Sequence, residues 1–304
     1  MTALAGRTEL YLAPDLEIGR AIAHVSQLLG RFVPDAALEA RVLVAAATRL
    51  ERIDLIRDPG RRLGEEASNR LAHFLERRIA HEPVSRILGS RGFWTLDVTI
   101  SPAVLDPRPD TETLIEVALR LCADRRNEPL RIVDLGTGSG AILCALLTEF
   151  PQATGVGVDL SPAACVVAQT NLDRNGLGER GRIMESNWAE GLDERFDLVV
   201  SNPPYIESLM IEALDPDVRD FDPRLALDGG PDGLAAYRAI GGDLDRILKR
   251  DALAIFETGV RQTAKVTKLM TGMGLEALGT WNDLGSNDRI VAFRTTRSHL
   301  SSES

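Results

Sequence analysis

The alternation of apolar and amphipathic stretches after residue 130 constrains the fold more than any other feature of this sequence. Strands are expected at 131–136, 155–160, 195–202 and 252–258, and helices at 140–150, 161–175, 234–248 and 261–273. A closing strand pair is expected near the C-terminus. Repeated strand–helix units predict a parallel sheet with helices on both faces. A ligand of such a sheet binds beyond the carboxyl ends of its strands.

The first third of the chain has a different pattern. Apolar residues recur at helical spacing in residues 15–29, 34–50 and 65–80, which predicts a small helical bundle. Residues 91–105 alternate with period 2, as in a strand pair or hairpin. We therefore expect a helical domain at 1–88, a β-hairpin linker at 89–106, an α/β domain at 107–297 and a disordered polar tail at 298–304.

Charge and cysteine content narrow the function classes. Residues 1–105 carry a formal charge of +1 and residues 106–304 carry −11. An acidic second half argues against tight binding to a phosphate backbone. The three cysteines form no CxxC pair and the four histidines lack ligand spacing, so neither a disulfide framework nor a metal site is expected. We find no signal peptide and no apolar run long enough to span a bilayer, so a cytoplasmic protein is expected.

A glycine-rich loop between the first strand and helix of the α/β region indicates a nucleotide cofactor. It comprises Gly136, Thr137, Gly138, Ser139 and Gly140. Asp159 ends the next strand, where its carboxylate could accept both hydroxyls of an adenosine ribose. The pattern also fits the G-x-G-x-x-G/A fingerprint of dinucleotide sites, so the loop alone leaves the choice of cofactor open.

The tetrapeptide Asn202-Pro203-Pro204-Tyr205 follows an apolar strand and indicates transfer to a planar amino group. A carboxamide NH₂ has two donors, and the Asn202 side-chain oxygen and the Pro203 carbonyl could accept both. The prolines would hold that carbonyl rigidly, which is a form of preorganisation. Tyr205 could pack its ring against the flat acceptor group. These residues suit methyl transfer from S-adenosylmethionine to an amide nitrogen.

Motifs along most of the chain resemble those of the HemK/PrmC family, the bacterial protein-(glutamine-N5) methyltransferases of peptide chain release factors. The matching stretches are 81–84, 87–89, 107–112 (PRPDTE), 202–205, 222–234 and 256–262. The resemblance implies a helical domain followed by a seven-stranded, Rossmann-like methyltransferase domain. It implies S-adenosylmethionine contacts at the glycine loop, Asp159, Trp188 and Asn202, with the acceptor glutamine held by residues 202–205. It also implies release factors as protein partners, and we expect a monomer.

Several positions keep two interpretations. Asn187 stands where the family commonly has Asp, and its carbonyl could still accept from the adenine amino group. Thr111 is expected to cap the helix that begins near Glu112. Arg108 could pair with acids near the site or form a surface ion pair. Glu257 could brace the 202–205 loop or be an ordinary buried, paired acid. Asp106 replaces an apolar residue of the family, and the sequence offers no account of it.

Other functions fit this sequence less well than glutamine methylation does. Amino-methyltransferases of adenine N6 or cytosine N4 also use Asn/Asp-Pro-Pro-Tyr, because an exocyclic amine poses the same donor problem. The acidic second half argues against that alternative. Glutamine methylation of a ribosomal protein is disfavoured by the PRPDTE stretch. A nicotinamide-dependent oxidoreductase leaves residues 202–205 unexplained, and a non-enzymatic binding protein leaves the intact motifs unexplained.

Overall fold

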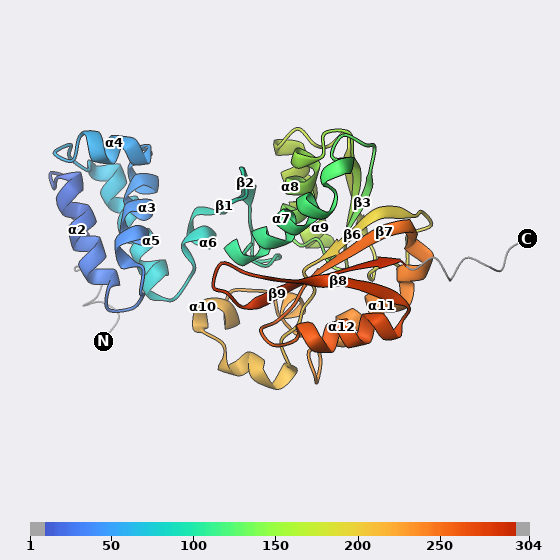
Figure 1. Cartoon of the computed structure of the whole chain (residues 1–304). Helices are drawn as coiled ribbons and strands as arrows, with labels where there is room; N and C mark the ends of the chain where they lie inside the picture. Colours follow the sequence, from blue (N-terminus) through green and yellow to red (C-terminus); the bar gives the residue numbers. More distant parts are fainter. Residues whose placement is uncertain (1–9, 296–304) are drawn as a thin grey trace, which may run out of the picture. The chain divides into compact units, whose positions relative to one another are not determined.

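The computed structural model describes residues 10–295 and divides into two compact units between Gly89 and Ser90 (Figure 1). The expected tail at 298–304 lies outside the described residues. The hairpin predicted as a linker is grouped with the second unit, and the boundaries given above stay predictions. Within residues 10–295, no helix combines the length and the apolar character that crossing a membrane requires.

The first unit consists of helices, as expected. They are α2 (Ile18–Leu29), α3 (Ala36–Thr48), α4 (Arg52–Arg57), α5 (Glu65–Ile79) and α6 (Val84–Leu88). The three longer helices were predicted from their apolar spacing, whereas the short α4 and α6 were not. Their apolar faces form one core that includes Leu43 and Leu71. The buried Arg78 of α5 pairs with Glu39 of α3 at 2.7 Å, which fixes the two helices together.

The second unit begins with an antiparallel hairpin, β1 (Ser90–Phe93) and β2 (Leu96–Thr99). Phe93 and Val98 are buried in the core of the α/β unit. Asn171 is fully buried and bonds to both backbone groups of Thr99, while its amide nitrogen also donates to the Ser139 carbonyl at 2.8 Å. The hydrogen bonds of the Asn171 side chain therefore connect the hairpin to the glycine loop.

A seven-stranded sheet forms the centre of the second unit, as the resemblance implied. Its order is β5-β4-β3-β6-β7-β9-β8. The strands are β3 (Arg131–Leu135), β4 (Thr154–Asp159), β5 (Gly181–Glu185), β6 (Phe196–Ser201), β7 (Leu248–Glu257), β8 (Leu275–Asn282) and β9 (Asp288–Thr295). All pairs from β5 to β7 are parallel, and β8 and β9 form the expected closing antiparallel pair.

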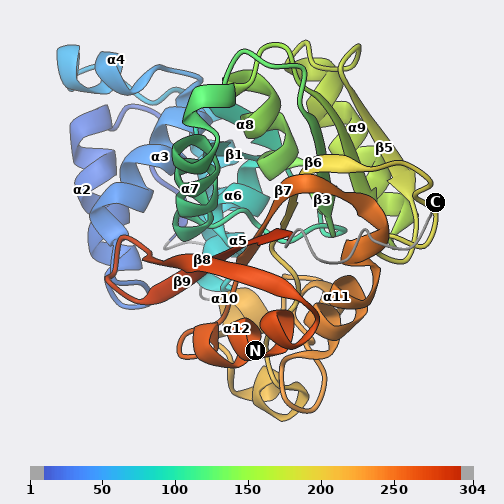
Figure 2. The same cartoon turned by 45° about the vertical axis from the view of Figure 1, so that its right-hand side comes forward.

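Helices cover both faces of this sheet (Figure 2). One face packs against α7 (Glu112–Leu121), α8 (Ala141–Glu149) and α9 (Pro162–Arg174). The other packs against α11 (Ala235–Ile247) and α12 (Thr263–Gly272). Helix α9 begins as predicted, with the Ser161 hydroxyl accepting from the Ala164 amide at 3.3 Å.

The direction of the chain across the sheet determines where a ligand binds. From β3 the chain runs outward through β4 and β5, and it then returns to the other side of β3 with β6. This reversal is the topological switch point, where a crevice opens beyond the carboxyl ends of the strands. The glycine loop and residues 202–205 both start at these ends.

The connection from β6 to α11 is formed by short elements. It contains η3 (Ser208–Ala213), α10 (Pro216–Arg219) and η4 (Arg224–Ala226). Another short element, η1 (Pro109–Thr111), leads into α7, and η2 (Ala123–Arg125) follows it.

Candidate active site

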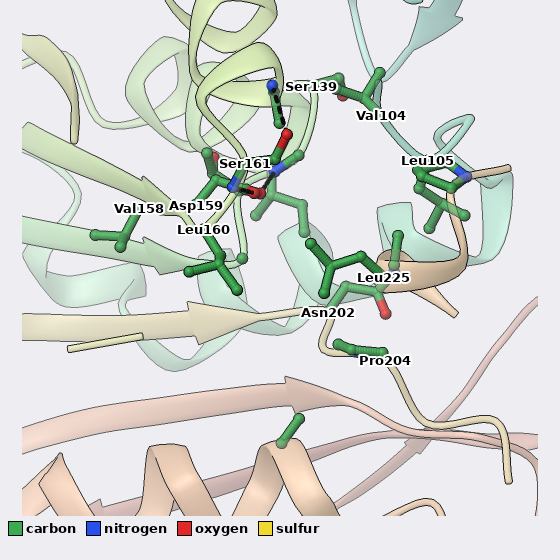
Figure 3. A pocket seen from close by; sticks show the side chains of 18 of the residues that line it. Val104, Leu105, Ser139, Val158, Asp159, Leu160, Ser161, Asn202, Pro204 and Leu225 are labelled. Atoms are coloured by element: carbon green, nitrogen blue, oxygen red, sulfur yellow. Dashed lines mark hydrogen bonds between the residues drawn. The ribbon is translucent and has the colours of Figure 1, made fainter. Parts of the chain in front are cut away.

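A pocket of about 670 Å³ lies at the carboxyl ends of β3, β4 and β6. This volume suits a small organic ligand. Figure 3 shows Asp159 and Leu160 at the end of one strand, and Asn202 and Pro204 on the loop that follows another strand. Nine of the twelve predicted site residues line it, namely Gly136, Thr137, Gly138, Ser139, Asp159, Asn187, Trp188, Asn202 and Pro204. Gly140, Pro203 and Tyr205 are not among the lining residues.

The glycine loop turns sharply between β3 and α8. The amides of Gly136 and Thr137 both donate to the Val158 carbonyl at 2.8 Å, which binds the loop to β4. Gly138 has φ +54°, and an added Cβ there would meet no protein atom within 4 Å, so its backbone faces open space. Gly140 has φ +77°, and an added Cβ would lie 3.1 Å from Ala168 of α9. Gly140 therefore allows close packing of two helices, while Gly138 leaves room for a ligand.

Asp159 is held in place by the backbone on either side of the crevice. Its Oδ2 accepts from the Gly138 amide and its Oδ1 from the Ser161 amide, each at 2.9 Å. A carboxylate has about four acceptor positions, so one remains on each oxygen for a pair of hydroxyls. These two acceptor positions fit the hydroxyls of the ribose of an adenosine cofactor.

Asn187 and Trp188 also line the pocket. The Trp188 ring contacts the backbone of Gly136, where an added Cβ would lie 3.1 Å from Cζ3. The Asn187 amide nitrogen donates to Glu190 at 2.6 Å, which leaves its carbonyl oxygen as the available acceptor. Asn187 thus presents the group that an adenine amino group requires.

The 202–205 loop begins where β6 ends. The buried Ser201 hydroxyl donates to the Leu135 carbonyl at 2.5 Å and joins this loop to the start of the glycine loop. The Asn202 amide nitrogen donates to the Thr111 hydroxyl oxygen at 3.3 Å. Because the two ends of a carboxamide point apart, the Asn202 oxygen remains as an acceptor. Pro203 is buried and does not line the pocket, whereas Pro204 does.

Three ionisable groups near the site have altered pKa values. Burial raises the pKa of Glu257 to about 7, although a hydrogen bond from Thr111 and the charge of Arg289 act in the opposite direction. Burial likewise raises the pKa of Asp134, below the glycine loop, to about 7, against a hydrogen bond from Thr137. Burial raises the pKa of the Tyr205 phenol to about 12, so this group stays neutral. Within residues 10–295, no cluster of His, Cys, Asp or Glu is arranged to hold a metal ion.

Comparison with known proteins identifies the family. A PrmC N-terminal domain matches residues 20–89, and a methyltransferase small domain matches residues 114–214. The release factor glutamine methyltransferase of Agrobacterium fabrum is 43% identical over 90% of this chain and 95% of its own length. That of Bradyrhizobium diazoefficiens is 46% identical over 79% of this chain and 82% of its own length. This chain belongs to the release factor glutamine methyltransferase family.

A solved structure agrees on the fold. A methyltransferase from Pyrococcus furiosus superposes with a TM-score of 0.50 at 16% identity, covering 75% of this chain and 98% of that one. The methyltransferase match spans both the glycine loop and residues 202–205. It therefore decides against the nicotinamide alternative, which rested on the glycine loop alone.

The family motif at 222–234 packs against the 202–205 loop. The Gly229 amide donates to the Ile206 carbonyl at 2.8 Å. An added Cβ at Gly229 would lie 2.9 Å from the Pro204 carbonyl oxygen, and one at Gly233 would overlap the Tyr205 carbonyl oxygen. The motif is glycine-rich because two backbone segments lie in direct contact here.

The family motif near 256–262 holds the same loop from another side. The Gln262 amide nitrogen donates to the Tyr205 carbonyl at 2.9 Å, and its oxygen accepts from the Gly259 amide at 3.1 Å. An added Cβ at Gly259 would lie 3.0 Å from the Tyr205 ring, so the ring packs on this backbone. Whether Tyr205 also contacts the acceptor stays a prediction.

Two ion pairs settle the open positions beside the PRPDTE stretch. Arg108 lines the pocket and pairs with the buried Asp222 at 2.6 Å, so it is not a surface ion pair. Asp106 is buried and accepts from Arg91 at 3.1 Å, while its backbone amide donates to Asp222 at 3.2 Å. The acid that the sequence left unexplained is thus the partner of an arginine on β1.

Thr111 requires a correction. It was expected to cap the helix that begins at Glu112, but its side chain makes no capping hydrogen bond. The hydroxyl instead accepts from Asn202, which lies 91 positions later in the chain. The Thr111 side chain therefore bonds to a residue distant in sequence and not to the backbone of the helix that follows it.

An apolar part of the pocket wall was not predicted from the sequence. Its residues come from the hairpin and the segment after it, and from the region of η4 and α11: Phe93, Val104, Leu105, Pro107, Pro223, Leu225, Ala226, Ala235, Ala236 and Ala239. The period-2 pattern predicted the hairpin but did not indicate that the hairpin contributes to the pocket wall. The matches at 107–112 and 222–234 were the available signal.

Proposed function

We propose that this chain transfers a methyl group from S-adenosylmethionine to the side-chain amide nitrogen, N5, of a glutamine in a peptide chain release factor. The position of Asn202 carries this proposal. Its amide nitrogen is engaged by Thr111, so its oxygen is free to accept from an NH₂ group in a pocket that fits an adenosine cofactor. Family membership supports release factors as the substrate class.

The residues around the pocket divide the work of binding. Asp159 would accept the ribose hydroxyls, the Asn187 carbonyl would accept from the adenine amino group, and residues 136–139 would lie along the cofactor. The cofactor supplies a methyl group on a positively charged sulfur, which makes that carbon electrophilic. The largely apolar walls of the pocket would exclude water and strengthen the polar contacts inside it.

The 202–205 loop would prepare the acceptor. A glutamine amide nitrogen is a weak nucleophile because its lone pair is delocalised into the carbonyl. The Asn202 oxygen and the Pro203 carbonyl would accept its two N–H groups and orient the nitrogen towards the methyl carbon. The nitrogen would form a bond to this carbon as the carbon–sulfur bond breaks, and it would release one proton after gaining positive charge. No strong base is required before the attack.

The remaining assignments complete the proposal. The helical domain at 1–88 would grip the release factor away from the chemistry, and the hairpin at 89–106 would link it to the catalytic domain at 107–297. The acceptor would be the exposed glutamine of a GGQ loop. The protein would act as a monomer in the cytoplasm, without a membrane or a stable nucleic-acid partner.

Mass spectrometry of a release factor incubated with enzyme and cofactor tests the proposal. We expect one methyl group, located by fragmentation on a single glutamine, and none when that glutamine is replaced by asparagine. Duplex DNA, RNA and ribosomal proteins serve as competing substrates in parallel reactions. Methylation of nucleic acid or of a ribosomal protein, with none on the release factor, would overturn the proposal.

A further inference from the structure

The orientation of the Asn202 side chain is a requirement of the proposed reaction. A carboxamide has a similar shape after a 180° turn, but that turn exchanges its acceptor oxygen for an NH₂ donor. A turned Asn202 would present N–H groups to the N–H groups of the glutamine. The proposed function therefore requires neighbouring groups that hold this amide in a single orientation.

We propose that Thr111 and Glu257 are positioning residues that hold the Asn202 amide with its nitrogen inward and its oxygen towards the acceptor glutamine. This inference rests on the proposed function and deepens it. The Thr111 hydroxyl oxygen accepts from the Asn202 amide nitrogen at 3.3 Å. Thr111 and Glu257 are only 3% and 2% exposed, so water cannot replace either partner.

Glu257 gives the Thr111 hydroxyl its direction. The Glu257 carboxyl group, at the end of β7, lies near enough to Thr111 and Asn202 for both side chains to lower its pKa against the effect of burial. A hydroxyl has one donor and two acceptor positions. When Thr111 donates to the ionised Glu257, its lone pairs are directed to the Asn202 N–H group. An amide turned the other way would instead place its oxygen against these acceptors.

The surroundings of Glu257 support an ionised state that is readily altered. The groups around it are Arg289 on β9, Asp110 on η1, Tyr205, and Tyr237 on α11. Arg289 favours the charged carboxylate, and it is itself held by Asp283 at 3.1 Å. Asp110 opposes the charge, and the Tyr237 hydroxyl donates to the Glu257 backbone carbonyl at 2.7 Å. In the described part of the chain, Oε2 of Glu257 has no hydrogen-bond partner.

The absence of a cap at Thr111 separates this role from ordinary helix stabilisation. The residue stands at the N-cap position of α7 but makes no capping hydrogen bond. A threonine that only packed the interior would be replaced by valine at little cost, because the two side chains have nearly the same shape. The proposal predicts a specific loss on this substitution, which recovers with serine.

The test compares Thr111→Val with Thr111→Ser and with the control Thr113→Val. Thr113 is buried in the first turn of α7, two positions after Thr111, and within residues 10–295 its side chain makes no hydrogen bond. We expect Thr111→Val to lower kcat on release factor about tenfold, the effect of one lost orienting hydrogen bond. The dissociation constant of S-adenosylmethionine, measured by calorimetry, should stay within about twofold. Thr111→Ser and the control should keep most of the wild-type kcat.

A second measurement does not depend on turnover. In protein labelled with [¹⁵N]asparagine, the Asn202 side-chain NH₂ signals are identified by their loss in Asn202→Ala. We expect Thr111→Val to shift them, and we expect them to shift in the wild type, but not in Glu257→Gln, as the pH passes about 7. This readout remains available if Thr111→Val folds poorly, because the pH series uses the wild-type protein.

The outcomes separate the inference from the proposed function. A wild-type enzyme that leaves release factor unmethylated would overturn the proposed function. An active wild type with undiminished kcat in Thr111→Val would overturn only the inference. Equal losses in the valine and serine variants, or NH₂ signals that move neither with Thr111→Val nor with pH, would do the same.

Discussion

Two carboxyl groups inside the α/β unit should make this protein less stable as the pH rises. Asp134 is fully buried below the glycine loop, and Glu257 is 2% exposed. Burial raises the pKa of each to about 7, from ordinary values of 3.8 and 4.5. An acid whose pKa is higher in the folded chain than in the unfolded chain makes its full contribution to stability at pH values below its pKa in the unfolded chain. That contribution is lost as the pH rises through the pKa that the group has in the folded chain.

The size of the loss in stability follows from the pH range between the pKa in the unfolded chain and the pKa in the folded chain. Between about pH 5 and pH 8, each group is already ionised in the unfolded chain, but in the folded chain it ionises only near pH 7. The loss therefore accumulates over roughly two pH units. At about 1.4 kcal/mol per unit, each group should lower the free energy of unfolding by about 3 kcal/mol.

Urea denaturation at a series of pH values measures this change. All three tryptophans, Trp94, Trp188 and Trp281, belong to the second unit, so their fluorescence reports its unfolding alone. Glu257→Gln and Asp134→Asn keep an acceptor oxygen but cannot ionise. Each substitution should therefore remove about half of the pH-dependent decrease in the free energy of unfolding. The exposed Glu207→Gln is the control and should leave the profile unchanged. Profiles of both buried variants that run parallel to the wild type would refute the reasoning.

Three further predictions concern binding and turnover. Asp159→Ala should weaken binding of S-adenosylmethionine at least about a hundredfold, because two hydrogen bonds of about 1.5–3 kcal/mol each are lost; an unchanged calorimetric dissociation constant would remove the ribose assignment. Asn202→Ala should lower kcat by roughly 10²–10³, the usual effect of losing one preorganised polar contact, and wild-type turnover in a single-turnover assay would contradict that role. Deletion of residues 1–88 should spare cofactor binding but abolish methylation of intact release factor, and full activity without them would exclude this domain from recognition.

Much of the fold could be predicted because its determinants are local. The strands β3, β4, β6 and β7 are apolar runs buried on both faces, and each was recognised from its own residues. Strand β5 was not predicted, since it lies at the sheet edge and its residues 181–185 are mostly exposed or half-buried. An edge strand needs no continuous apolar run, so the sequence carries little sign of it.

The site was predictable as far as the sheet determines it. Parallel strands end at the same edge, so the glycine loop, Asp159 and Asn202 were expected to meet, and all of these residues except Gly140 line one pocket. The supporting contacts were not predictable, because they join residues far apart in sequence. Thr111 has the local pattern of a helix cap, and its pairing with Asn202 depends on the folded arrangement of η1 and β6. The Arg91–Asp106 pair likewise exists only once the hairpin has packed.

The most direct test of the account is a crystal structure with S-adenosylhomocysteine and a glutamine-containing peptide from a release factor. The account predicts that the glutamine nitrogen lies about 2.6–3.2 Å from both the Asn202 side-chain oxygen and the Pro203 carbonyl oxygen. The nitrogen should also face the cofactor sulfur. A complex in which the Asn202 oxygen points away from the bound glutamine would contradict the central claim.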